Sequence, residues 1–391
     1  MTDAGDRKKR LARLATGLAL RAARPVIRLL TRSPRKGVRR SLWAGTPILT
    51  LPVKAKAERV LGVQADTLVY QTYYITSDFK YDLSKWNRGP AVWRAMLLPL
   101  LVLVWAALKY QRFHFFCDRG LLPGERFEFR EDELSFLRSL GKEVFFYTYG
   151  ADVRTRQKTL TLGEPNCCTS CPEPGRFCVC DDEVGAKRQA TLSRYATRVF
   201  ALGDMVHYTP GSRNDVFFWP LDLSKEDGRR YEPRYPDPVA TSPVRIVHAP
   251  NHQGFKGTTH LVSAVKRLQD RGVPVELQMV ERVPNLEALE MYREADIVFD
   301  QCLIGFHGYF ALEAMAMGKP VVVFLRDPKN DLLAADECPM VNVRPETIES
   351  VLAELAGNRA RLHELGRQGR RYIERHYTVE AFAERLRRAM G

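Results

Sequence analysis

The feature that most constrains this chain is an alternation of strand and helix that runs along it twice. Between the two runs, residues 220–243 hold five prolines among charged and polar residues, a composition typical of a linker. Strands that alternate with helices indicate a parallel sheet. We therefore expect an α/β chain with two doubly wound, Rossmann-like halves facing a central cleft, where open α/β sheets bind ligands.

The expected elements follow from β-branched and aromatic runs for strands and from longer amphipathic or apolar segments for helices. In the first run the strands are expected over 46–53, 67–75, 111–117, 143–149 and 198–202, and the helices over 54–61, 91–108, 131–140 and 183–196. In the second run the strands are expected over 245–249, 275–280, 297–300 and 320–324, and the helices over 258–271, 286–294, 309–317, 345–355, 359–373 and 379–390.

A length of 391 residues suits two or three domains. The expected division is an arm (1–42), an N-terminal domain (43–222) with a cysteine-rich insert (164–182), a linker (223–243), a C-terminal domain (244–377) and a closing helix (378–391).

The positive charge is concentrated in the arm. Of a net charge of +14, thirteen basic residues lie between Arg7 and Arg40 with no acidic residue among them, which leaves +1 for the rest. A near-neutral body argues against nucleic acid as a partner, because tracking a phosphate backbone needs charge along the binding groove. A steep salt dependence of binding to DNA or RNA would revive that alternative.

Residues 7–32 form a predicted amphipathic helix. One face carries Leu11, Leu14, Leu18, Ala22 and Leu29, with arginines on the other side. This pattern favours docking on an anionic membrane surface; the alternative is a solubilising tail or a misassigned start. The longest apolar run, residues 95–108, has 14 residues against the roughly 20 that a spanning helix needs. It is expected to cover the sheet, with an interfacial helix as the alternative.

Five of the eight cysteines fall within residues 167–180. The arm has no compact apolar core followed by a small-residue cleavage site, so we expect no cleavable signal peptide and a reducing, cytoplasmic location, peripheral on the cytoplasmic membrane face. The spacing of Cys168, Cys171, Cys178 and Cys180 suits one tetrahedral zinc with a structural role. An iron–sulfur cluster, and thiols or a regulatory disulfide, are the alternatives.

Two stretches of the second half carry the chemistry. The first, His248-Ala-Pro-Asn-His-Gln-Gly-Phe-Lys-Gly-Thr258, follows a predicted strand and opens a helix. Backbone N–H groups at a helix start, the close approach that Gly257 permits and the charge of Lys256 together predict a cradle for a diphosphate. The alternative is a loop with an exposed lysine.

The second stretch runs from Asp300 to Val322. Its turn from Gly305 to Gly308 is expected to present backbone N–H groups to sugar or phosphate. Glu313 lies in an otherwise apolar helix start, where a buried carboxylate needs partners. A ribose diol would supply two donors; a local backbone cap is the alternative.

These stretches resemble the C-terminal domain of retaining glycosyltransferases of the GT-B fold, specifically family four. Leu312-Glu-Ala-Met-Ala-Met-Gly-Lys-Pro-Val-Val322 is similar to that family's donor-site helix, and residues 248–258 to its phosphate loop. The resemblance covers about 244–382 and is weaker over 112–219, where Tyr149-Gly-Ala-Asp-Val-Arg154 is similar to the acceptor-side loop.

The resemblance implies that Glu313 binds the donor ribose and Lys256 the diphosphate. Asp152 would accept from an acceptor hydroxyl and Arg154 would bind a phosphate or carboxylate; the alternative is a salt bridge within the domain. In two places the chain departs from the family: Gly305 stands where a second glutamate is usual, and Asn251 where an arginine is usual.

His252, if protonated, and His307 are the candidates to compensate for the two departures. The resemblance implies transfer of a sugar from a nucleotide-diphosphate sugar to a glycan or lipid-linked acceptor, with retention, in polysaccharide or cell-envelope glycan synthesis. No metal cofactor is expected for catalysis, because the helix start and Lys256 can meet the leaving charge. The missing glutamate supports the alternative of a catalytically inactive binding protein or scaffold.

Overall fold

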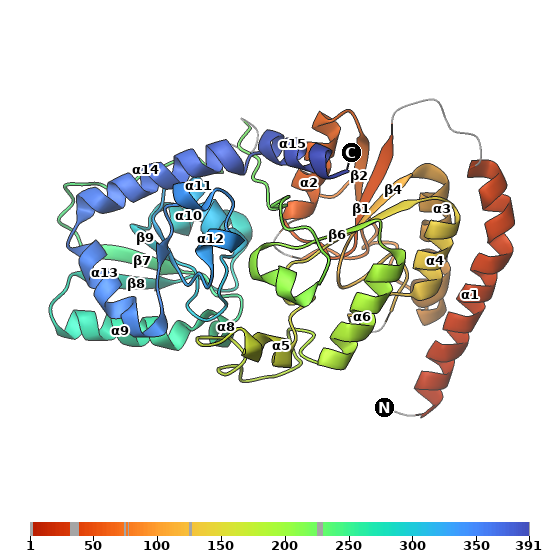
Figure 1. Cartoon of the computed structure of the whole chain (residues 1–391), viewed down its shortest axis with the longest axis horizontal. Coiled ribbons are helices and arrows are strands. Elements are labelled where there is room, and N and C mark those ends of the chain that lie inside the picture. The colour runs from red at the N-terminus through yellow and green to blue at the C-terminus, as the bar shows by residue number, and fades with distance from the viewer. Residues whose placement is uncertain are drawn as a thin grey trace. The chain divides into compact units, whose positions relative to one another are not determined.

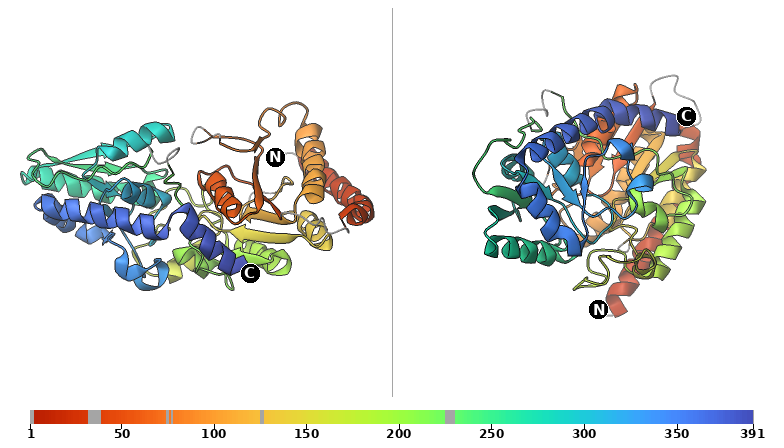
Figure 2. Two further views of the ribbon diagram at one scale, coloured as in Figure 1. Left: turned by 90° about the horizontal axis from the view of Figure 1, so that it is seen from above. Right: turned by 60° about the vertical axis from the view of Figure 1, so that its left-hand side comes forward.

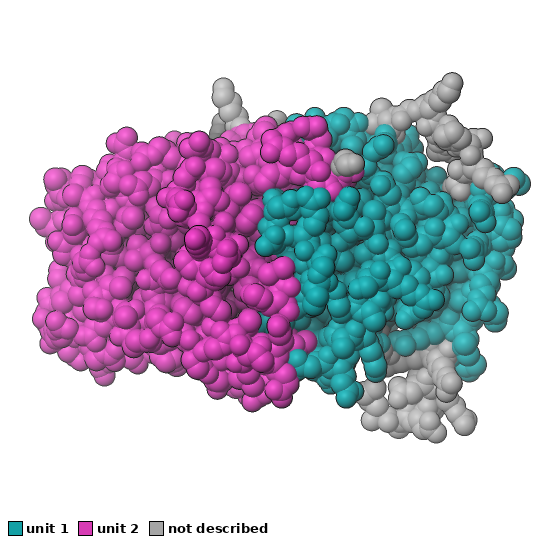
Figure 3. Space-filling view, viewed as in Figure 1, with its two compact units in different colours: residues 1–154, 178–201, 208–216 teal, residues 155–177, 202–207, 217–391 magenta. Residues whose placement is uncertain are grey.

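The computed structural model describes residues 3–31, 39–73, 76, 78–124, 127–224 and 230–390. The chain forms two compact units, coloured separately in Figure 3. Unit 1 comprises residues 1–154, 178–201 and 208–216, and unit 2 comprises residues 155–177, 202–207 and 217–391. Each unit holds one parallel sheet, which confirms the expected pair of doubly wound halves.

The sheet of unit 1 has six strands, and every pairing in it is parallel. Its strand order is β3 (Tyr81–Asp82), β2 (Gln64–Val69), β1 (Arg40–Ala44), β4 (Arg112–Phe116), β5 (Glu143–Tyr147) and β6 (Arg198–Phe200). The helices of this unit are α1 (Asp3–Thr31), α2 (Thr50–Val60), the π-helix η1 (Trp93–Leu97) with α3 (Leu98–Lys109), α4 (Glu131–Ser139) and α6 (Asp182–Tyr195). Figures 1 and 2 show them around the sheet.

The strand expected over 46–53 is wrong. The first strand is β1, Arg40–Ala44, so it begins inside the expected arm, and α2 begins at Thr50. Leu42 and Ala44 are buried in β1 between two neighbouring strands, whereas Pro52 lies in the first turn of α2, where a missing N–H costs nothing. The β-branched residues of 46–53 suggested a strand, but the segment that is buried between two other strands, and so forms β1, is 40–44.

The predicted amphipathic helix forms as α1, which packs along α3 and α4 in both views (Figures 1 and 2). One face buries Thr16, Leu20 and Ile27, and Leu14 and Leu18 on the opposite face stay 59% and 64% exposed. The apolar face predicted from the sequence therefore points outward, away from the packing contact. Among the described residues no helix combines the length and the apolar character that crossing a membrane requires.

The sheet of unit 2 has five parallel strands, in the order β11 (Val341–Asn342), β10 (Val321–Val323), β9 (Ile297–Phe299), β7 (Val244–His248) and β8 (Val275–Met279). Its helices are α5 (Arg156–Thr161), α8 (Gln253–Lys256), α9 (Thr258–Asp270), α10 (Asn285–Arg293), α11 (Tyr309–Ala316), α12 (Pro328–Asp331), α13 (Ile348–Ala356), α14 (Arg359–His376) and α15 (Val379–Met390). Ile246, Phe299 and Val322 project from the sheet into a core closed by α9 and α13.

Part of the cysteine-rich insert, expected in the N-terminal domain, belongs to unit 2. Arg326 donates three hydrogen bonds to backbone carbonyl groups of residues 162–165, at 2.8 to 3.0 Å, and Arg344 donates a fourth at 2.8 Å. These bonds join residues 155–177 to the loops that follow β10 and β11. The sequence gives no sign of them, because they link backbone groups to side chains some 160 residues away.

A buried polar group ties α2 to the sheet of unit 1. The carboxylate of Glu58 accepts hydrogen bonds from Ser41 Oγ and from Trp43 Nε1 (2.7 Å), and its Oε1 lies 3.4 Å from His114 Nε2. Burial alone would raise the pKa of Glu58, but His114 and the two donors hold it below its ordinary value. The ionised carboxylate thus stabilises the fold above the carboxyl pKa of the unfolded chain, and that contribution is lost as the pH falls.

We predict that Glu58→Gln destabilises the protein by about 3 kcal/mol at pH 7, because it removes one charge from a buried hydrogen-bonded set. The difference from the parent should narrow as the pH falls through the lowered pKa of Glu58, because the side chain then takes up a proton in the folded protein as well. Denaturant unfolding at several pH values measures both effects. The control is Glu143→Gln. The side chain of Glu143 pairs with Arg112 but is 41% exposed, so the expected loss of stability is about 0–1 kcal/mol. Equal losses in the two variants would contradict the prediction.

Candidate functional site

The first stretch singled out in the sequence lies at the carboxyl end of β7. His248 ends that strand, and its ring is held at both nitrogens, by Phe299 O (2.8 Å) and Thr258 Oγ1 (2.9 Å). Burial lowers the pKa of His248 to about 4, so the ring is neutral at pH 7. His248 therefore ties the start of the loop after β7 both to β9 and to α9. It adds no charge to the site.

Gly257 joins α8 to α9 with a φ of +71°, in the left-handed region. A Cβ atom at this position would lie 2.3 Å from Cys302 Sγ and 3.1 Å from Leu303 Cγ. Both the conformation and the available space therefore require glycine. The close backbone approach that the sequence predicted at Gly257 is made to Cys302 and Leu303, in the loop after β9.

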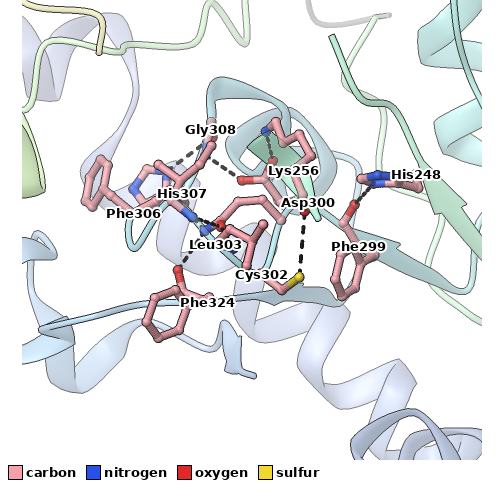
Figure 4. A network of polar contacts seen from close by, with 12 residues as sticks. His248, Lys256, Phe299, Asp300, Cys302, Leu303, Phe306, His307, Gly308 and Phe324 are labelled. Carbon is pink, nitrogen blue, oxygen red and sulfur yellow. Dashed lines mark hydrogen bonds and ion pairs between the residues drawn. The ribbon is translucent and has the colours of Figure 1, made fainter. Parts of the chain in front are cut away.

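Lys256 and Gly308 meet at one carboxylate, that of Asp300 (Figure 4). Lys256 Nζ donates to Asp300 Oδ1, and the backbone N–H of Gly308 donates to Oδ2, both at 2.5 Å. Burial alone would raise the pKa of Asp300, but Lys256 and the two hydrogen bonds lower it, so the carboxylate is ionised. Lys256, expected to bind a diphosphate, and the turn expected to face sugar or phosphate are thus brought to the same point by a residue that the sequence analysis did not single out.

Gln301 shapes the loop between β9 and α11. Its Oε1 accepts hydrogen bonds from the backbone N–H groups of Leu303 (2.8 Å) and Ile304 (2.6 Å). Its Nε2 donates to the carbonyl groups of Phe306 (3.3 Å) and Phe324 (2.7 Å). One buried amide therefore satisfies four backbone groups and fixes the turn that carries Gly305 and Gly308.

His307 lies in this turn with 2% of its surface exposed. Its Nδ1 lies 3.2 Å from Gly308 O, and its Nε2 has no hydrogen-bond partner among the described residues. Burial lowers the pKa of His307 to about 4, so the ring is neutral at pH 7. A neutral imidazole can donate or accept one hydrogen bond at its unpaired nitrogen, depending on the tautomer, but it cannot supply a positive charge.

Gly305, which stands where the family usually has a glutamate, has a φ of +98°. A Cβ atom there would lie 3.0 Å from Arg326 Nε and 3.2 Å from Arg326 Cβ. Any side chain at this position would therefore start in tight contact with Arg326 and in a backbone conformation that favours glycine. This geometry accounts for glycine at the position and places a guanidinium there that the sequence analysis missed.

Glu313 is 4% exposed in α11, and the Tyr231 hydroxyl donates to its Oε1 at 3.1 Å. Burial raises the pKa of Glu313 to about 7, although hydrogen bonds from Tyr231 and Asn285 act to lower it. Tyr231 lies in the proline-rich stretch expected to be a linker. The partners of Glu313 in the structure are therefore side chains.

Asn251 and His252 precede α8. Asn251 is exposed, and His252 Nδ1 accepts a hydrogen bond of 3.2 Å from the backbone N–H of Phe255. This bond requires Nδ1 without its proton, so His252 in this position does not add a second positive charge beside Lys256. It acts as the N-terminal cap of the four-residue helix.

Asp152 and Arg154 lie in unit 1. Asp152 is fully buried, and its carboxylate accepts from the backbone N–H groups of Tyr149 (2.8 Å), Gly150 (2.9 Å) and Cys117 (3.2 Å). Burial raises its pKa to about 7. Arg154 is 6% exposed, with its guanidinium 5.8 Å from the centre of the Tyr208 ring. Asp152 holds the loop together here, and the contacts of both residues with an acceptor stay a prediction.

The predicted zinc ligands are divided between the units: Cys168 and Cys171 belong to unit 2, and Cys178 and Cys180 to unit 1. Within the part of the chain that the structure describes, no three histidine, cysteine or acidic side chains are grouped so as to hold a metal ion. Structural zinc therefore stays a prediction.

Among the residues that the sequence analysis missed, Asp300, Tyr231 and Arg326 each contact a predicted site residue directly. Asp300 had a signal, because an acidic residue directly after a buried strand sits at the edge where open α/β sheets bind ligands. Tyr231 and Arg326 had none, since only the folded chain brings them beside Glu313 and Gly305.

No protein-family model matches this chain, and no curated protein matches it in sequence. Among solved structures, sucrose-phosphate synthase from Thermosynechococcus elongatus is similar, with a TM-score of 0.55 and 11% identity over 90% of this chain and 98% of that one. WaaG, a glycosyltransferase involved in lipopolysaccharide biosynthesis, gives a TM-score of 0.49 and 12% identity, covering 90% and 98%. MurG from Acinetobacter baumannii gives 0.42 and 13%, covering 90% and 100%.

The two Rossmann-like units and the likeness to the synthase show that this chain has the GT-B fold. At 11% identity, the likeness extends to the fold alone.

We predict that Gly257→Ala destabilises the protein by about 3 kcal/mol or more. The change forces a left-handed alanine, which costs roughly 1–2 kcal/mol, and a clash with Cys302. Gly272→Ala is the matched control, because Gly272 has a φ of +78° and nothing within 4 Å of the added atom. Thermal unfolding of both variants separates the two costs. If Gly272→Ala were as damaging as Gly257→Ala, close packing at the loop would not be the cause.

Proposed function

We propose that the protein is a glycosyltransferase that moves a sugar from a nucleotide-diphosphate sugar to a glycan or lipid-linked acceptor. The observation that carries this proposal is the convergence of Lys256 and the Gly308 N–H at the carboxyl ends of β7 and β9. In an open α/β sheet this edge is where nucleotides bind. The resemblance of residues 244–382 to family four supports retention of configuration and a role in polysaccharide or cell-envelope glycan synthesis.

The diphosphate would bind at Lys256. An ammonium group has three N–H donors, and Asp300 accepts from one of them, so two remain for phosphate oxygens. The N-terminus of α9 adds backbone N–H groups and a partial positive charge close to Lys256. As the glycosidic bond to the phosphate breaks, these donors meet the charge that develops on the leaving diphosphate.

The nucleoside and the sugar would bind on either side of that point. Glu313 would accept hydrogen bonds from the ribose hydroxyl groups, with Tyr231 and Asn285 holding its carboxylate in place. The unoccupied His307 Nε2 would contact the sugar. Asp152 and Arg154 are proposed to serve the acceptor, the former through the loop that it fixes.

One observation favours a second candidate, a binding protein that keeps the fold without catalysis. Gly305, packed against Arg326, stands where family four usually places a glutamate against the donor sugar. Such a protein would bind the nucleotide sugar and leave it intact. Measuring release of the nucleotide diphosphate from the bound nucleotide sugar, with and without acceptor glycans, separates the two candidates.

We predict that Glu313→Gln abolishes nucleotide binding and leaves the protein folded. Because burial raises the pKa of Glu313 to about 7, the folded protein accommodates the neutral acid near that pH, and a neutral amide fits the same place. Thermal shift with UDP, GDP, ADP and their sugar conjugates measures binding; a hundredfold excess over the dissociation constant stabilises by about 2.7 kcal/mol. Glu290→Gln, on an exposed face of α10, is the control. A shift that survives in Glu313→Gln would remove Glu313 from the donor site.

We also propose that unit 1 docks on an anionic membrane surface at the cytoplasmic face. Leu14 and Leu18 of α1 are exposed, and α3, which lies beside α1, exposes Leu101 (59%) and Trp105 (36%). Two neighbouring helices thus each expose apolar side chains, and α3 buries Leu98, Val102 and Leu103 on its other face. Exposed arginines of α1, among them Arg21, Arg24 and Arg28, supply the attraction to acidic headgroups.

We predict that the double variant Leu14→Gln/Leu18→Gln folds normally and binds phosphatidylglycerol vesicles about a hundredfold more weakly. Both side chains are exposed in the protein, and each contributes roughly 1.5 kcal/mol or more when buried among lipids. Vesicle sedimentation measures the binding. The control, Val262→Gln/Leu286→Gln, removes two exposed apolar side chains from unit 2. Unchanged sedimentation of the α1 variant would contradict membrane docking through this face.

A further inference from the structure

The cysteine-rich insert and the loop proposed to bind the diphosphate share an aromatic contact within unit 2. The ring of Phe177 stands edge-on against His252, with 4.3 Å between ring centres and 88° between ring planes. His252 in turn stacks on Phe255 at 4.2 Å and 18°. The insert thus contacts the residue that caps α8.

A second contact leaves no spare room between the two segments. A Cβ atom added to Gly254 would lie 2.8 Å from Pro172 Cδ. Pro172 belongs to a rigid ring, so it cannot move aside as a flexible side chain would. Figure 1 shows the chain after α5 running beside α8, as these distances require.

The insert is itself anchored to the unit on its other side. Cys167 is 1% exposed and lies in the same apolar core as Cys302 and Leu303, the residues against which Gly257 packs. The four hydrogen bonds from Arg326 and Arg344 hold the backbone at 162–165, where the insert begins. Phe177 and Pro172 therefore extend from a segment that is fixed in place.

The loop needs this support. The helix α8 has four residues, and a helix of one turn has almost no stability of its own in water. Its cap, His252, is half-buried, and the contacts of its ring described above are with Phe255 in the same turn and with Phe177 in the insert. Removing Phe177 would take away the ring that the insert places against this cap.

We infer that the insert is a positioning element of the donor site: Phe177 and Pro172 hold His252 and Gly254, and through them the N–H groups and the lysine of residues 252–257. Its effect on affinity rests on the proposed function, that is, on nucleotide-diphosphate binding by this loop. Its effect on the order of the loop does not depend on any ligand. The insert thereby sets how well the diphosphate site is formed before the nucleotide arrives.

The experiment compares Phe177→Ala, Phe177→Tyr and the control Val239→Ala in the full chain. Phe177 is 38% exposed and Val239 is 81% exposed, so neither truncation opens a core. Hydrogen exchange reports on the loop without ligand, and titration with UDP, GDP and ADP reports on the site. We expect the amides of 253–257 to exchange about fivefold faster in Phe177→Ala and the nucleotide that binds to be held about fivefold more weakly, the worth of one aromatic pair. Phe177→Tyr and Val239→Ala should match the parent.

Gly254→Ala gives an independent test, because helix propensity alone and the contact with Pro172 predict opposite effects on hydrogen exchange. Alanine favours a helix over glycine by roughly 1 kcal/mol, so the change alone should slow exchange in α8. The clash with Pro172 should instead speed exchange in 253–257 and in 170–177 together.

Unchanged exchange in Phe177→Ala, or slower exchange in Gly254→Ala, would overturn the positioning role. Faster exchange with unchanged nucleotide affinity would overturn the link to the donor site. If the parent binds none of the three nucleotides, the proposed function fails, and the exchange data alone then support or overturn the positioning role.

Discussion

The candidate site depends on one buried carboxylate. Asp300 accepts from the ammonium of Lys256 on one side and from the N–H of Gly308 on the other, so it joins the loop after β7 to the loop after β9. A buried charge of this kind is stable only when paired and hydrogen-bonded, and Asp300 has both forms of support. The pair brings no net charge to the site. Attraction for a diphosphate must then come from the remaining ammonium hydrogens and from the helix N-terminus, which act at short range and in fixed directions.

Most of the fold could be predicted from the sequence because its periodic signals are local. The helices α9, α11 and α14 and the strands β4, β5 and β7 lie within a few residues of their predicted bounds, since apolar patterning and flanking turns define them. The error at 46–53 came from a place where patterning gave the wrong answer. Thr50 and Val53 are β-branched, yet both lie in α2, and β1 forms at Arg40–Ala44, where the charge of the arm hid the strand.

The candidate site was accessible to sequence reasoning only in part. Lys256, Gly257, Gly308 and Glu313 stand in motifs, and a motif places its own residues relative to one another. Contacts between distant segments leave no such trace. Arg326 reaches the insert across more than 160 positions, and Tyr231 meets Glu313 across 82. Both contacts depend on how helices and loops pack, which neither spacing nor composition encodes. The same reason explains why residues 164–177 of the insert were expected in the other half.

The division of the chain between the units bears on how the protein is made. The chain passes from one unit to the other five times, so no single cut separates them. Strand β6 can pair with β5 once it leaves the ribosome, whereas the insert must wait for Arg326, which lies 161 positions beyond Pro165. At 5–20 residues per second, that interval is roughly 8 to 30 s. During this time the cysteine-rich segment is outside the ribosome while the arginines that bind it have yet to be synthesised, so its thiols are open to oxidation before the fold can hold them.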